Sequence, residues 1–418
     1  LPNRNMLQDR LEQLIKKEKR GGLEFALLLI DLDQFKEVND TLGHDRGDEL
    51  LIDAAKRIRK CLRESDTVAR IGGDEFVIIL SELSLLSGVE LVAQHIIDAL
   101  SESFLLGQES AFVSASIGIT LYPEDAREIV GLMKNADQAM YSAKKLGGNR
   151  YHFFTQAMQQ EALNRMQLKS DMHVAIRENQ FKLYYQPVVE LETGKIHKAE
   201  ALLRWQHESR GLISPADFIE VAEDSRMIID IGDWVFLEAA RQIKYWRESI
   251  SSDFQVSINA SPIQFENQSS VSWRNHLHNQ GIDGQAICIE ITESLLMTSD
   301  QSVLDTLLGF RDAGIQVALD DFGTGYSSLS YLRKFDIDYL KIDRSFVQNL
   351  SRNSDDLALC AAIIVMAHKL GIKVVGEGIE SEAQKDLLVS IGCDFGQGNL
   401  FSMPIPADEF ERFLQDTA

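Results

Sequence analysis

Two short strings in this 418-residue chain place acidic side chains where they could act on a phosphate. Residues 70–76 read Arg-Ile-Gly-Gly-Asp-Glu-Phe and lie between two strand-like runs. The Gly72-Gly73 pair permits the positive φ that a two-residue hairpin needs. Asp74 and Glu75 then stand side by side next to an opening without side chains, which suits a metal-bound triphosphate.

The second string, Glu200-Ala-Leu-Leu-Arg204-Trp205, closes an extended segment and pairs an acid with an arginine four residues later. Polar side chains also end the later strand-like runs, which recur about every thirty residues with helical stretches between them, as βα units require. Capping of a following helix explains any one of them, but glutamate, lysine and glutamine are poor N-caps. The pattern therefore predicts the active-site mouth of a (β/α)8 barrel. The later members are Asn259, Glu290, Asp320 with Asp321, Lys341, Glu377 and Gln397.

So many buried carboxylates indicate bound cations, because like charges repel strongly at low dielectric. Carboxylate and amide oxygens favour Mg²⁺ or Mn²⁺ over zinc. The neighbours Asp320 and Asp321 predict a carboxylate that bridges two metal ions, and such a pair activates water for in-line displacement at phosphorus. Lys341 is expected to orient that water or to neutralise developing charge, and Arg204 to hold a phosphate oxygen.

The order of predicted elements divides the chain into three parts. Residues 1–154 alternate helices with hairpin-linked strands, which predicts an α+β domain with the palm-like layout of nucleotide cyclases. Residues 155–179 contain neither glycine nor proline and carry apolar residues near helical spacing, which favours a helical connector. Residues 180–418 carry the βα pattern, which predicts an α/β TIM-like barrel.

Bulk composition limits the function further. The formal charge of −22 argues against nucleic acid as a partner, since phosphate backbones are bound mainly through lysine and arginine. The four scattered cysteines predict reduced thiols in a cytoplasmic protein. No apolar run is long enough to cross a bilayer, so membrane contact is not expected from this segment. The chain begins Leu-Pro-Asn-Arg without a methionine, which predicts that it is cut from a longer protein; an upstream sensor or membrane region is compatible with this sequence.

From about Phe181 to Leu414 the chain resembles the EAL phosphodiesterases, which hydrolyse cyclic di-GMP. The matching strings include Glu200–Trp205, Asp320–Ser328 and Gly396–Ser402. That resemblance implies a metal role for Glu200, Asn259, Glu290, Asp320, Asp321 and Glu377, places Lys341, Glu377 and Gln397 at the reacting water, and gives substrate contacts to Gln186, Leu202 and Arg204. It also implies that Glu293 anchors the loop Asp321–Ser328, which couples dimerisation to metal binding. Ala260, Asn399 and Met403 depart from the usual pattern, but none of them removes a metal ligand.

Residues 1–154 resemble the GGDEF domains, which make cyclic di-GMP from GTP. The resemblance implies that Asp31, the Leu32 carbonyl and Asp74 hold Mg²⁺, that Glu75 is the base for the attacking hydroxyl, that Lys36 and Lys144 contact phosphates, and that Asn39 and Asp48 read guanine. An amide with a carboxylate suits the donors and acceptors of a guanine edge. Gly148 stands where many active relatives carry a phosphate-binding arginine, and losing such a contact costs about 1.5–3 kcal/mol. Arg63 and Asp66 match the inhibitory product site of the family, although a solvated ion pair at a helix end would give the same pattern.

Three hypotheses follow. The first is a bifunctional homodimeric enzyme, whose barrel hydrolyses cyclic di-GMP to pGpG with two metal ions and whose first domain condenses two GTP. The second keeps the hydrolase alone, with GTP on the first domain as an allosteric activator. The third is a catalytically inactive cyclic di-GMP receptor, which the retained acidic residues disfavour. Turnover assays with GTP and with cyclic di-GMP separate the three.

Overall fold

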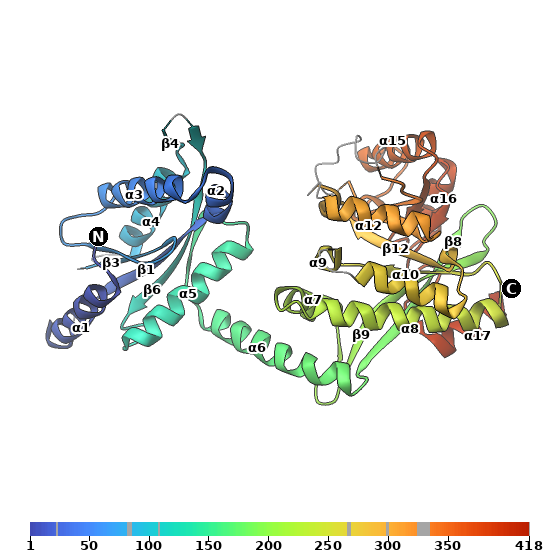
Figure 1. The fold of residues 1–418 in the computed structure, drawn as a ribbon, viewed down its shortest axis with the longest axis horizontal. Helices are drawn as coiled ribbons and strands as arrows, with labels where there is room; N and C mark the ends of the chain where they lie inside the picture. Colours follow the sequence, from blue (N-terminus) through green and yellow to red (C-terminus); the bar gives the residue numbers. More distant parts are fainter. Residues whose placement is uncertain are drawn as a thin grey trace. The chain divides into compact units, whose positions relative to one another are not determined.

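The computed structural model describes residues 1–21, 24–81, 86–107, 109–265, 269–297, 301–323 and 335–417. They form two compact units, Leu1–Met166 and Gln167–Ala418, and each is described by itself (Figure 1). The division falls inside helix α6 (Gln156–Arg177), which covers most of the segment predicted as a helical connector.

Unit 1 has the predicted α+β fold. Its five-stranded sheet has the order β2-β3-β1-β6-β7, in which β7 is parallel to β6 and the other neighbours are antiparallel. The strands are β1 (Phe25–Asp33), β2 (Thr67–Gly72), β3 (Glu75–Leu80), β6 (Ser114–Tyr122) and β7 (Arg150–Phe153), with a separate hairpin of β4 (Phe104–Leu106) and β5 (Glu109–Ala111). The helices are α1 (Arg4–Gly21), α2 (Phe35–Leu42), α3 (His44–Lys60), α4 (Leu86–Ser101) and α5 (Ile129–Lys145).

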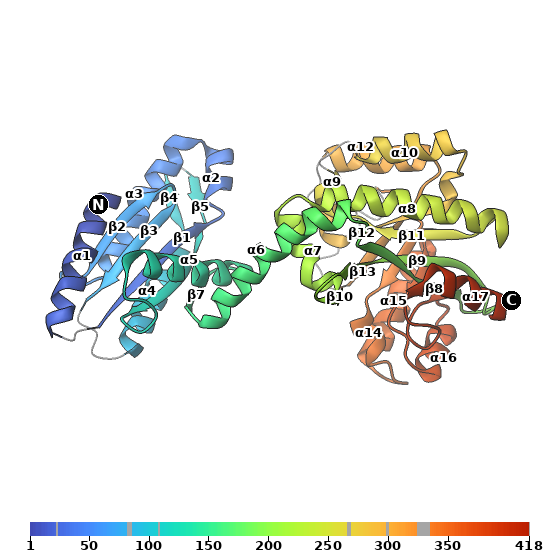
Figure 2. The ribbon, with the colours of Figure 1, turned by 90° about the horizontal axis from the view of Figure 1, so that it is seen from below.

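Strand β1 is the centre of this unit because its side chains are buried on both faces of the sheet. Ala26, Leu28 and Ile30 face one apolar cluster together with residues of α3 and α4. Phe25, Leu27 and Leu29 face a second cluster with residues of α1 and α5. Since side chains alternate along a strand, a continuous apolar run is what a doubly covered strand requires. Figure 2 shows the helices on either side of the sheet.

Unit 2 is a closed barrel of eight strands within the described residues, with an additional hairpin strand β10 and a short strand β17 at its margin. The barrel strands are β8 (Phe181–Glu190), β9 (Ile196–His207), β11 (Gln255–Asn259), β12 (Ile287–Thr292), β13 (Gln316–Phe322), β14 (Tyr339–Ile342), β15 (Lys373–Gly376) and β16 (Phe395–Gly396), while β10 covers Gly211–Ile213 and β17 Ile405–Pro406. The helices are α7 (Pro215–Asp224), α8 (Ile228–Ser249), α9 (Pro262–Phe265), α10 (Ser269–Gln280), α11 (Glu293–Met297), α12 (Gln301–Asp312), α14 (Arg344–Gln348), α15 (Asp355–Lys369), α16 (Glu382–Ser390) and α17 (Ala407–Thr417), with a 3₁₀ turn at Gly284–Ala286.

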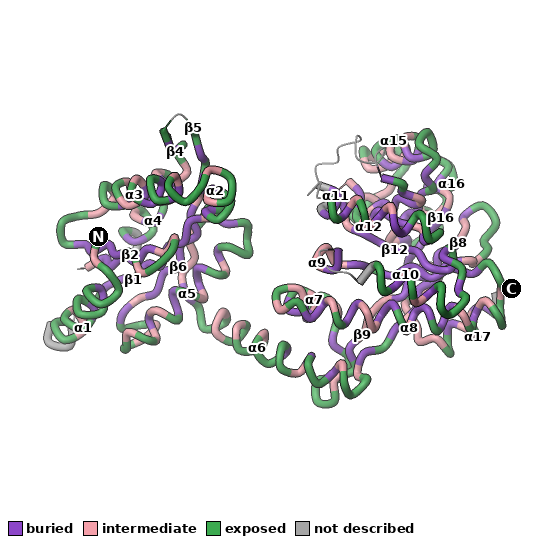
Figure 3. The backbone as a smooth tube through the Cα atoms, in the orientation of Figure 1, coloured by how far each residue is buried: buried purple, intermediate pink, exposed green. Residues whose placement is uncertain are grey.

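The predicted TIM-like barrel is confirmed, with one reversal of strand direction. Strand β8 runs antiparallel to both of its neighbours, β9 and β16, whereas the pairs from β9 through β16 are parallel. The C-terminal part of α6 packs on this barrel through Leu168, Met172 and Ala175, all of them buried. Figure 3 shows burial concentrated along the barrel strands, with exposed residues along the outer faces of the helices.

Some boundaries differ from the sequence-based prediction. The string Glu200–Trp205 does not end its strand, because β9 continues to His207 and pairs there with β10. The apolar spacing after Leu86 predicts a helix that reaches Phe104, but α4 stops at Ser101 and Phe104 begins the hairpin β4–β5, which was not predicted. The four cysteines are free; Cys61 is half-buried and the others are buried. Among the helices that the structure describes, none combines the length and apolar character needed to cross a membrane.

Candidate active site

The ammonium group of Lys341 lies at the centre of four carboxylates inside the barrel. Its Nζ is 2.5 Å from Glu290 Oε2, 2.7 Å from Glu377 Oε1, 3.2 Å from Asp320 Oδ1 and 3.5 Å from Glu200 Oε2. These residues come from five different strands or strand ends, β9, β12, β13, β14 and the residue after β15. Parallel strands deliver their carboxyl ends to one mouth of a barrel, which is why residues so far apart in sequence meet here.

Two amide side chains complete the inner wall of this cluster. Asn259 donates its Nδ2 to Glu200 Oε1 at 2.6 Å, and Gln397 donates its Nε2 to Glu200 Oε2 at 2.6 Å. The Gln397 amide also contacts Gln186 Oε1 at 3.0 Å. All seven strand-end positions expected from the sequence therefore converge, although Glu200 does so from the middle of its strand. The metal-binding roles of the acids and of Asn259, and the places of Lys341 and Gln397 at the reacting water, remain predictions.

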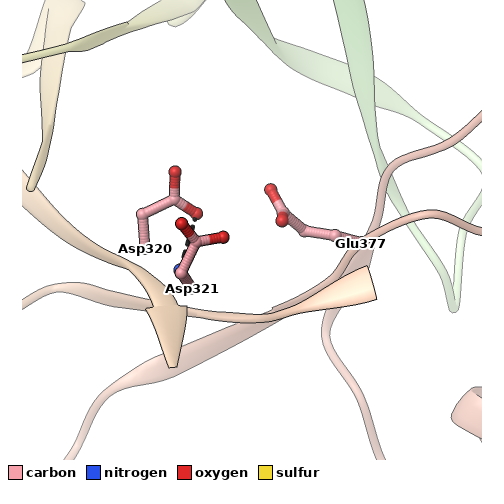
Figure 4. Close-up of side chains that lie close together, drawn as sticks. All are labelled: Asp320, Asp321 and Glu377. Atoms are coloured by element: carbon pink, nitrogen blue, oxygen red, sulfur yellow. Dashed lines mark hydrogen bonds between the residues drawn. The ribbon is translucent and has the colours of Figure 1, made fainter. Parts of the chain in front are cut away.

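Consecutive residues Asp320 and Asp321 both reach the mouth because the strand is irregular there. Side chains of a regular strand point alternately to opposite faces. The pairing of β13 with β14 shifts register between Leu319 and Phe322, and Asp321 has a φ of 54°. This irregularity turns Asp321 so that its carboxylate joins those of Asp320 and Glu377 (Figure 4). Oxygen atoms of the three carboxylates lie within 4.8 Å of one another.

Burial and mutual repulsion govern ionisation in this cluster. Burial and the neighbouring Glu200 raise the pKa of Glu290 well above its usual value. Burial likewise raises the pKa of Glu377 to about 7, against the opposing effect of Lys341. For Glu200, burial is outweighed by Lys341 and the amide donors, so its pKa falls below the usual value. For Lys341, the four carboxylates outweigh burial and raise the pKa, which keeps the ammonium charged.

The donor set fits hard divalent cations. It consists of carboxylate and amide oxygens without sulfur or imidazole, which is the preference of Mg²⁺ and Mn²⁺. The Oε1 atom of Gln397 is buried and has no hydrogen-bond partner among the described residues. A buried acceptor normally has a donor, and a water molecule held by a cation would supply one here. Glu200, Asn259, Glu290, Asp320, Asp321 and Glu377 are the residues that would hold the cations.

Cation binding should strengthen as the pH rises from 6 to 8. Glu377 has its pKa raised to about 7, so it is mostly protonated at pH 6 and must lose that proton to bind a cation. Deprotonation over this range predicts an apparent Mn²⁺ affinity about tenfold higher at pH 8 than at pH 6. Isothermal calorimetry of Mn²⁺ binding at three pH values measures the effect, and an affinity that does not change with pH would contradict it.

The three expected substrate contacts lie together beside the cluster. Gln186 is directly opposite Glu200 in the β8–β9 register, and Tyr184 is opposite Leu202. Glu200, Leu202 and Arg204 occupy alternate positions of β9 and therefore share one face of the strand. The Arg204 guanidinium lies 5.6 Å from the ring centre of Tyr184, and burial lowers its pKa.

Glu293 begins α11 and is buried, consistent with an anchoring position. Its Oε2 accepts the Gly323 amide at 3.4 Å. The rest of the loop expected to couple dimerisation to metal binding, residues 324–328, lies outside the described residues.

In unit 1 the β1–β3 register places Asp31 directly opposite Glu75. Lys144 reaches across from α5, with its Nζ 2.7 Å from Asp31 Oδ1. Burial and the nearby Asp74 raise the pKa of Asp31, while burial and Asp31 raise that of Glu75. Three carboxylates and one ammonium therefore lie together where β1 ends and β3 begins, which is the arrangement that a cation with a triphosphate would require.

The Gly72-Gly73 turn opens onto a cavity of about 550 Å³. Its other walls are the N-terminal residues 1–5 and Leu51, Ile52 and Ala55 of α3. A Cβ atom added to either glycine would meet nothing within 4 Å. Asp74 and Glu75 are not among the residues that line this cavity, so an opening beside them remains a prediction.

The other expected nucleotide contacts of unit 1 lie on α2 and α3. Lys36 is exposed near the start of α2, Asn39 is half-buried on α2, and Asp48 is exposed on α3. Asn39 lies against the first turn of α3: a Cβ atom on Gly47 would lie 1.9 Å from Asn39 Oδ1, so a larger residue at position 47 would displace the Asn39 side chain. Leu32 is buried in β1, opposite Ala115. These roles remain predictions.

Gly148 adopts a φ of +66°, and a Cβ atom there would lie 2.8 Å from Asp33 Oδ2. Asp33 was not predicted from the sequence: it accepts hydrogen bonds from Ser114 Oγ, Ser116 Oγ and the Asn149 amide. The loop that lacks the usual arginine is thus fastened tightly to β1. An arginine at position 148 would need this contact to relax.

Arg63 is exposed, and Asp66 is buried with its Oδ2 accepting the Arg63 amide at 2.9 Å. A turn therefore holds both residues near the end of α3. Whether a ligand binds this turn remains a prediction.

Two further residues of the barrel mouth were not predicted. Asp343 is hydrogen-bonded to Asp321 and caps α14 by accepting the Ser345 amide at 3.0 Å. Glu223, on α7, accepts the Ser261 hydroxyl at 2.8 Å and so fastens the turn that follows Asn259. Asp343, two residues after Lys341, could have been noticed from its spacing, whereas the Glu223 contact depends on tertiary structure.

Comparison with known proteins decides the family. Residues 169–404 match the EAL domain, and residues 1–150 match the diguanylate cyclase GGDEF domain. The chain is a tandem GGDEF–EAL protein. Its GGDEF–EAL sequence is 42% identical over 410 residues to the bifunctional diguanylate cyclase/cyclic di-GMP phosphodiesterase MucR of Pseudomonas aeruginosa, covering 98% of the chain and 60% of MucR. It is 37% identical to the cyclic di-GMP phosphodiesterase PdeR of Escherichia coli, covering 99% of the chain and 62% of PdeR.

Solved structures also resemble this chain. The PaMucR phosphodiesterase, in complex with c-di-GMP, is 39% identical with a TM-score of 0.56, covering 58% of this chain and 99% of that one. The EAL enzyme Bd1971 in its cAMP- and cyclic-di-GMP-bound form is 28% identical with a TM-score of 0.59, covering 84% and 92%. The chain spans less than two thirds of the length of MucR and of PdeR.

Proposed function

We propose that the EAL unit hydrolyses cyclic di-GMP to linear pGpG with two divalent cations, Mg²⁺ or Mn²⁺, and that the GGDEF unit condenses two GTP into cyclic di-GMP. The observation that carries the proposal is the convergence of five carboxylates, two amides and a lysine at one mouth of the barrel. The activities for which MucR and PdeR are named support it.

Each residue of the EAL site has its own proposed role in hydrolysis. Arg204, Leu202 and Gln186 hold the dinucleotide along β8 and β9, with the Arg204 guanidinium on a phosphate oxygen. The bound cations would supply an activated water and neutralise charge that develops at phosphorus. Lys341 adds a positive charge beside that phosphorus, and Gln397 Oε1 accepts a hydrogen bond from the water and so orients it.

The GGDEF unit would bind GTP at the hairpin. Asp31, Asp74 and the Leu32 carbonyl would hold Mg²⁺, and Lys36 and Lys144 would contact phosphates. Glu75, whose pKa is raised by burial and by Asp31, is suited to accept the proton of the attacking hydroxyl. Because two GTP molecules must meet, condensation requires two copies of the chain.

A second candidate function keeps hydrolysis but makes the GGDEF unit a GTP-binding regulator. The Gly148 loop favours it, since position 148 carries glycine in place of the usual arginine and lies against Asp33. The two candidates differ in one assay: purified protein is incubated with GTP and Mg²⁺ while cyclic di-GMP formation is followed by chromatography. Formation of product supports the bifunctional enzyme. Faster hydrolysis of added cyclic di-GMP in the presence of GTP, without formation of product, supports the regulator. No turnover of either substrate would refute both and leave a receptor.

Replacing Arg63 with alanine should relieve product inhibition of the GTP reaction. Arginine can donate two hydrogen bonds to the O6 and N7 atoms of a guanine, and each good bidentate pair is worth about 1–3 kcal/mol. The cyclic di-GMP concentration that halves the initial rate should therefore rise roughly tenfold or more. If the reaction stalls at the same product concentration as in the wild type, Arg63 has no regulatory role.

A further inference from the structure

We infer that a cavity of the EAL unit, distinct from the carboxylate cluster, binds a nucleoside 5′-phosphate. The cavity has a volume of about 450 Å³, and its walls come from β8, α8 and the start of α17. Cavities that bind small molecules commonly measure about 300–1,000 Å³, so a mononucleotide fits this volume. The inference goes beyond the proposed function, because neither proposed reaction uses this cavity.

The floor of the cavity lies on the outer face of β8. Gln186 lies opposite Glu200 in the β8–β9 register and belongs to the face that carries the cluster. Successive side chains of a strand point to opposite faces, so Tyr185 points the other way. There it packs against Trp246 of α8 and Phe410 of α17, with ring centres 4.7 and 6.1 Å away. The floor is therefore on the other side of the barrel wall from the carboxylates.

Two buried polar side chains of this cavity each have one polar atom without a protein partner. Tyr185 is 1% exposed and Gln242 is 7% exposed, and both line the cavity. Within the described residues the Tyr185 hydroxyl makes no hydrogen bond, and Gln242 donates its Nε2 to Glu411 while its Oε1 accepts none. Neither atom is fully enclosed, so both touch accessible space. Since buried polar groups normally have partners, the pair indicates a bound molecule with a matching acceptor and donor.

Two charged neighbours locate the Tyr185 hydroxyl at the cavity wall. Burial raises the pKa of Tyr185, Glu238 raises it further, and Arg241 lowers it. Both of these residues line the same cavity. The hydroxyl therefore keeps its proton at neutral pH and can donate it in a hydrogen bond to a ligand.

The charges of the lining favour an anionic group at the rim. Lys182 and Arg241 are exposed cations, and Glu238 is the single carboxylate among the lining residues that the structure describes. Arg241 binds Glu238 through its Nε and Nη2 atoms, at 3.0 and 2.6 Å, and keeps its Nη1 donors for a ligand. One excess positive charge contrasts with the net charge of −22 of the chain. A phosphate beside these two cations would accept charge-assisted hydrogen bonds.

A nucleotide combines the features that this lining requires. The edge of its base places an acceptor next to an N–H donor, which matches the Tyr185 hydroxyl and Gln242 Oε1. The half-buried Trp234 offers an aromatic surface to the base. The phosphate then reaches Lys182 and Arg241. Guanosine 5′-phosphate has this chemistry, and both GTP and linear pGpG contain it.

Calorimetric titration of the full chain with GMP tests the site. EDTA is present, because it removes the cations that both proposed active sites would need to hold a phosphate. One GMP should bind per chain, and Tyr185→Phe should weaken its affinity by about three- to tenfold, the effect of losing one neutral hydrogen bond. No binding at millimolar GMP, or an affinity that Tyr185→Phe leaves unchanged, overturns the inference.

A matched control removes the hydroxyl of another buried tyrosine. Tyr339 is 8% exposed, its hydroxyl lies 3.4 Å from Gln316 Oε1, and it does not line the cavity. Tyr339→Phe should leave the affinity for GMP at the wild-type value. If it weakens binding as much as Tyr185→Phe does, the effect is a general one on the barrel and the inference is wrong.

A variant at the rim tests the phosphate end and leaves the core intact. Lys182→Met should weaken binding of GMP by about two- to fivefold, since an exposed charge pair contributes modestly. It should leave binding of guanosine unchanged; an equal loss for both ligands would contradict the assigned phosphate position.

Titrations with pGpG and with GTP under the same conditions identify the source of the ligand. A nucleotide whose affinity falls in Tyr185→Phe is a ligand of this cavity. Hydrolysis and condensation are assayed separately. Binding of GMP that depends on Tyr185, in a chain without either activity, refutes the proposed function alone. Hydrolysis by a chain that binds no GMP in EDTA refutes the inference alone.

Discussion

Replacing Glu200 with glutamine is expected to lower kcat/KM for cyclic di-GMP hydrolysis by at least about 1,000-fold, or about 4 kcal/mol of transition-state stabilisation. Glu200 is 5% exposed and accepts hydrogen bonds from Asn259 and Gln397, in addition to its contact with Lys341. Glutamine preserves the shape but removes the charge that a cation would bind. The decrease in kcat/KM should exceed the 10–100-fold decrease that is typical of residues that only position a metal ligand.

A matched control tests whether the loss of hydrolysis is specific to Glu200. Glu192→Gln removes an exposed carboxylate from the same unit and should leave hydrolysis at the wild-type rate. Condensation of GTP, which is proposed for the other unit, should be unaffected by Glu200→Gln. Hydrolysis that persists in the Glu200→Gln protein at saturating Mn²⁺ would exclude Glu200 as a ligand.

The members of the EAL cluster could be found from sequence because a barrel delivers strand ends to one mouth. Core packing alone seldom places an acid, amide or lysine at the end of a buried run, and Asn259, Lys341 and Gln397 were found this way. The contacts among them could not be found. That Lys341 would lie within 3.5 Å of four carboxylates depends on the register of neighbouring strands, such as Asn259 opposite Glu290, which no local pattern encodes.

Asp321 shows a second limit of local reasoning. Two consecutive aspartates on a regular strand face opposite sides, so the pair by itself does not say that both reach one site. The irregular pairing of β13 with β14 and the positive φ of Asp321 bring them together. The end of β9 was predicted too early for a similar reason. Residues 205–207 stay in the strand because they pair with β10, which follows the next turn.

The GGDEF unit shows the same division between local pattern and tertiary contact. The doubly buried run of β1 and the Gly72-Gly73 hairpin follow from residue types. The facing of Asp31 and Glu75 follows from the β1–β3 register, and the Lys144–Asp31 contact from the packing of α5. The hairpin β4–β5 was missed because the apolar pattern of α4 continues into Phe104, while the chain leaves the helix at Ser101.

Replacing Asp74 with asparagine and Glu75 with glutamine together should abolish formation of cyclic di-GMP from GTP. The pair adjoins Asp31, and burial with Asp31 raises the pKa of Glu75, the expected base. The change removes a cation ligand and the proton acceptor while the Gly73 turn keeps its backbone. The expected loss is at least about 1,000-fold, since both a charge-stabilising and a proton-transfer contribution disappear.

The measurement is cleanest in a Glu200→Gln background, where product made by the GGDEF unit cannot be consumed by the EAL unit. In this background, the protein with the wild-type hairpin should accumulate cyclic di-GMP, and the protein with the altered hairpin should accumulate none. Glu102→Gln with Glu109→Gln removes two exposed carboxylates from the same unit and should leave accumulation unchanged. If the hairpin variant made cyclic di-GMP at an undiminished rate, the reacting groups would have to lie outside the hairpin. If neither protein makes product, but GTP still accelerates hydrolysis in the chain with an intact Glu200, the GGDEF unit is a nucleotide sensor for its EAL partner.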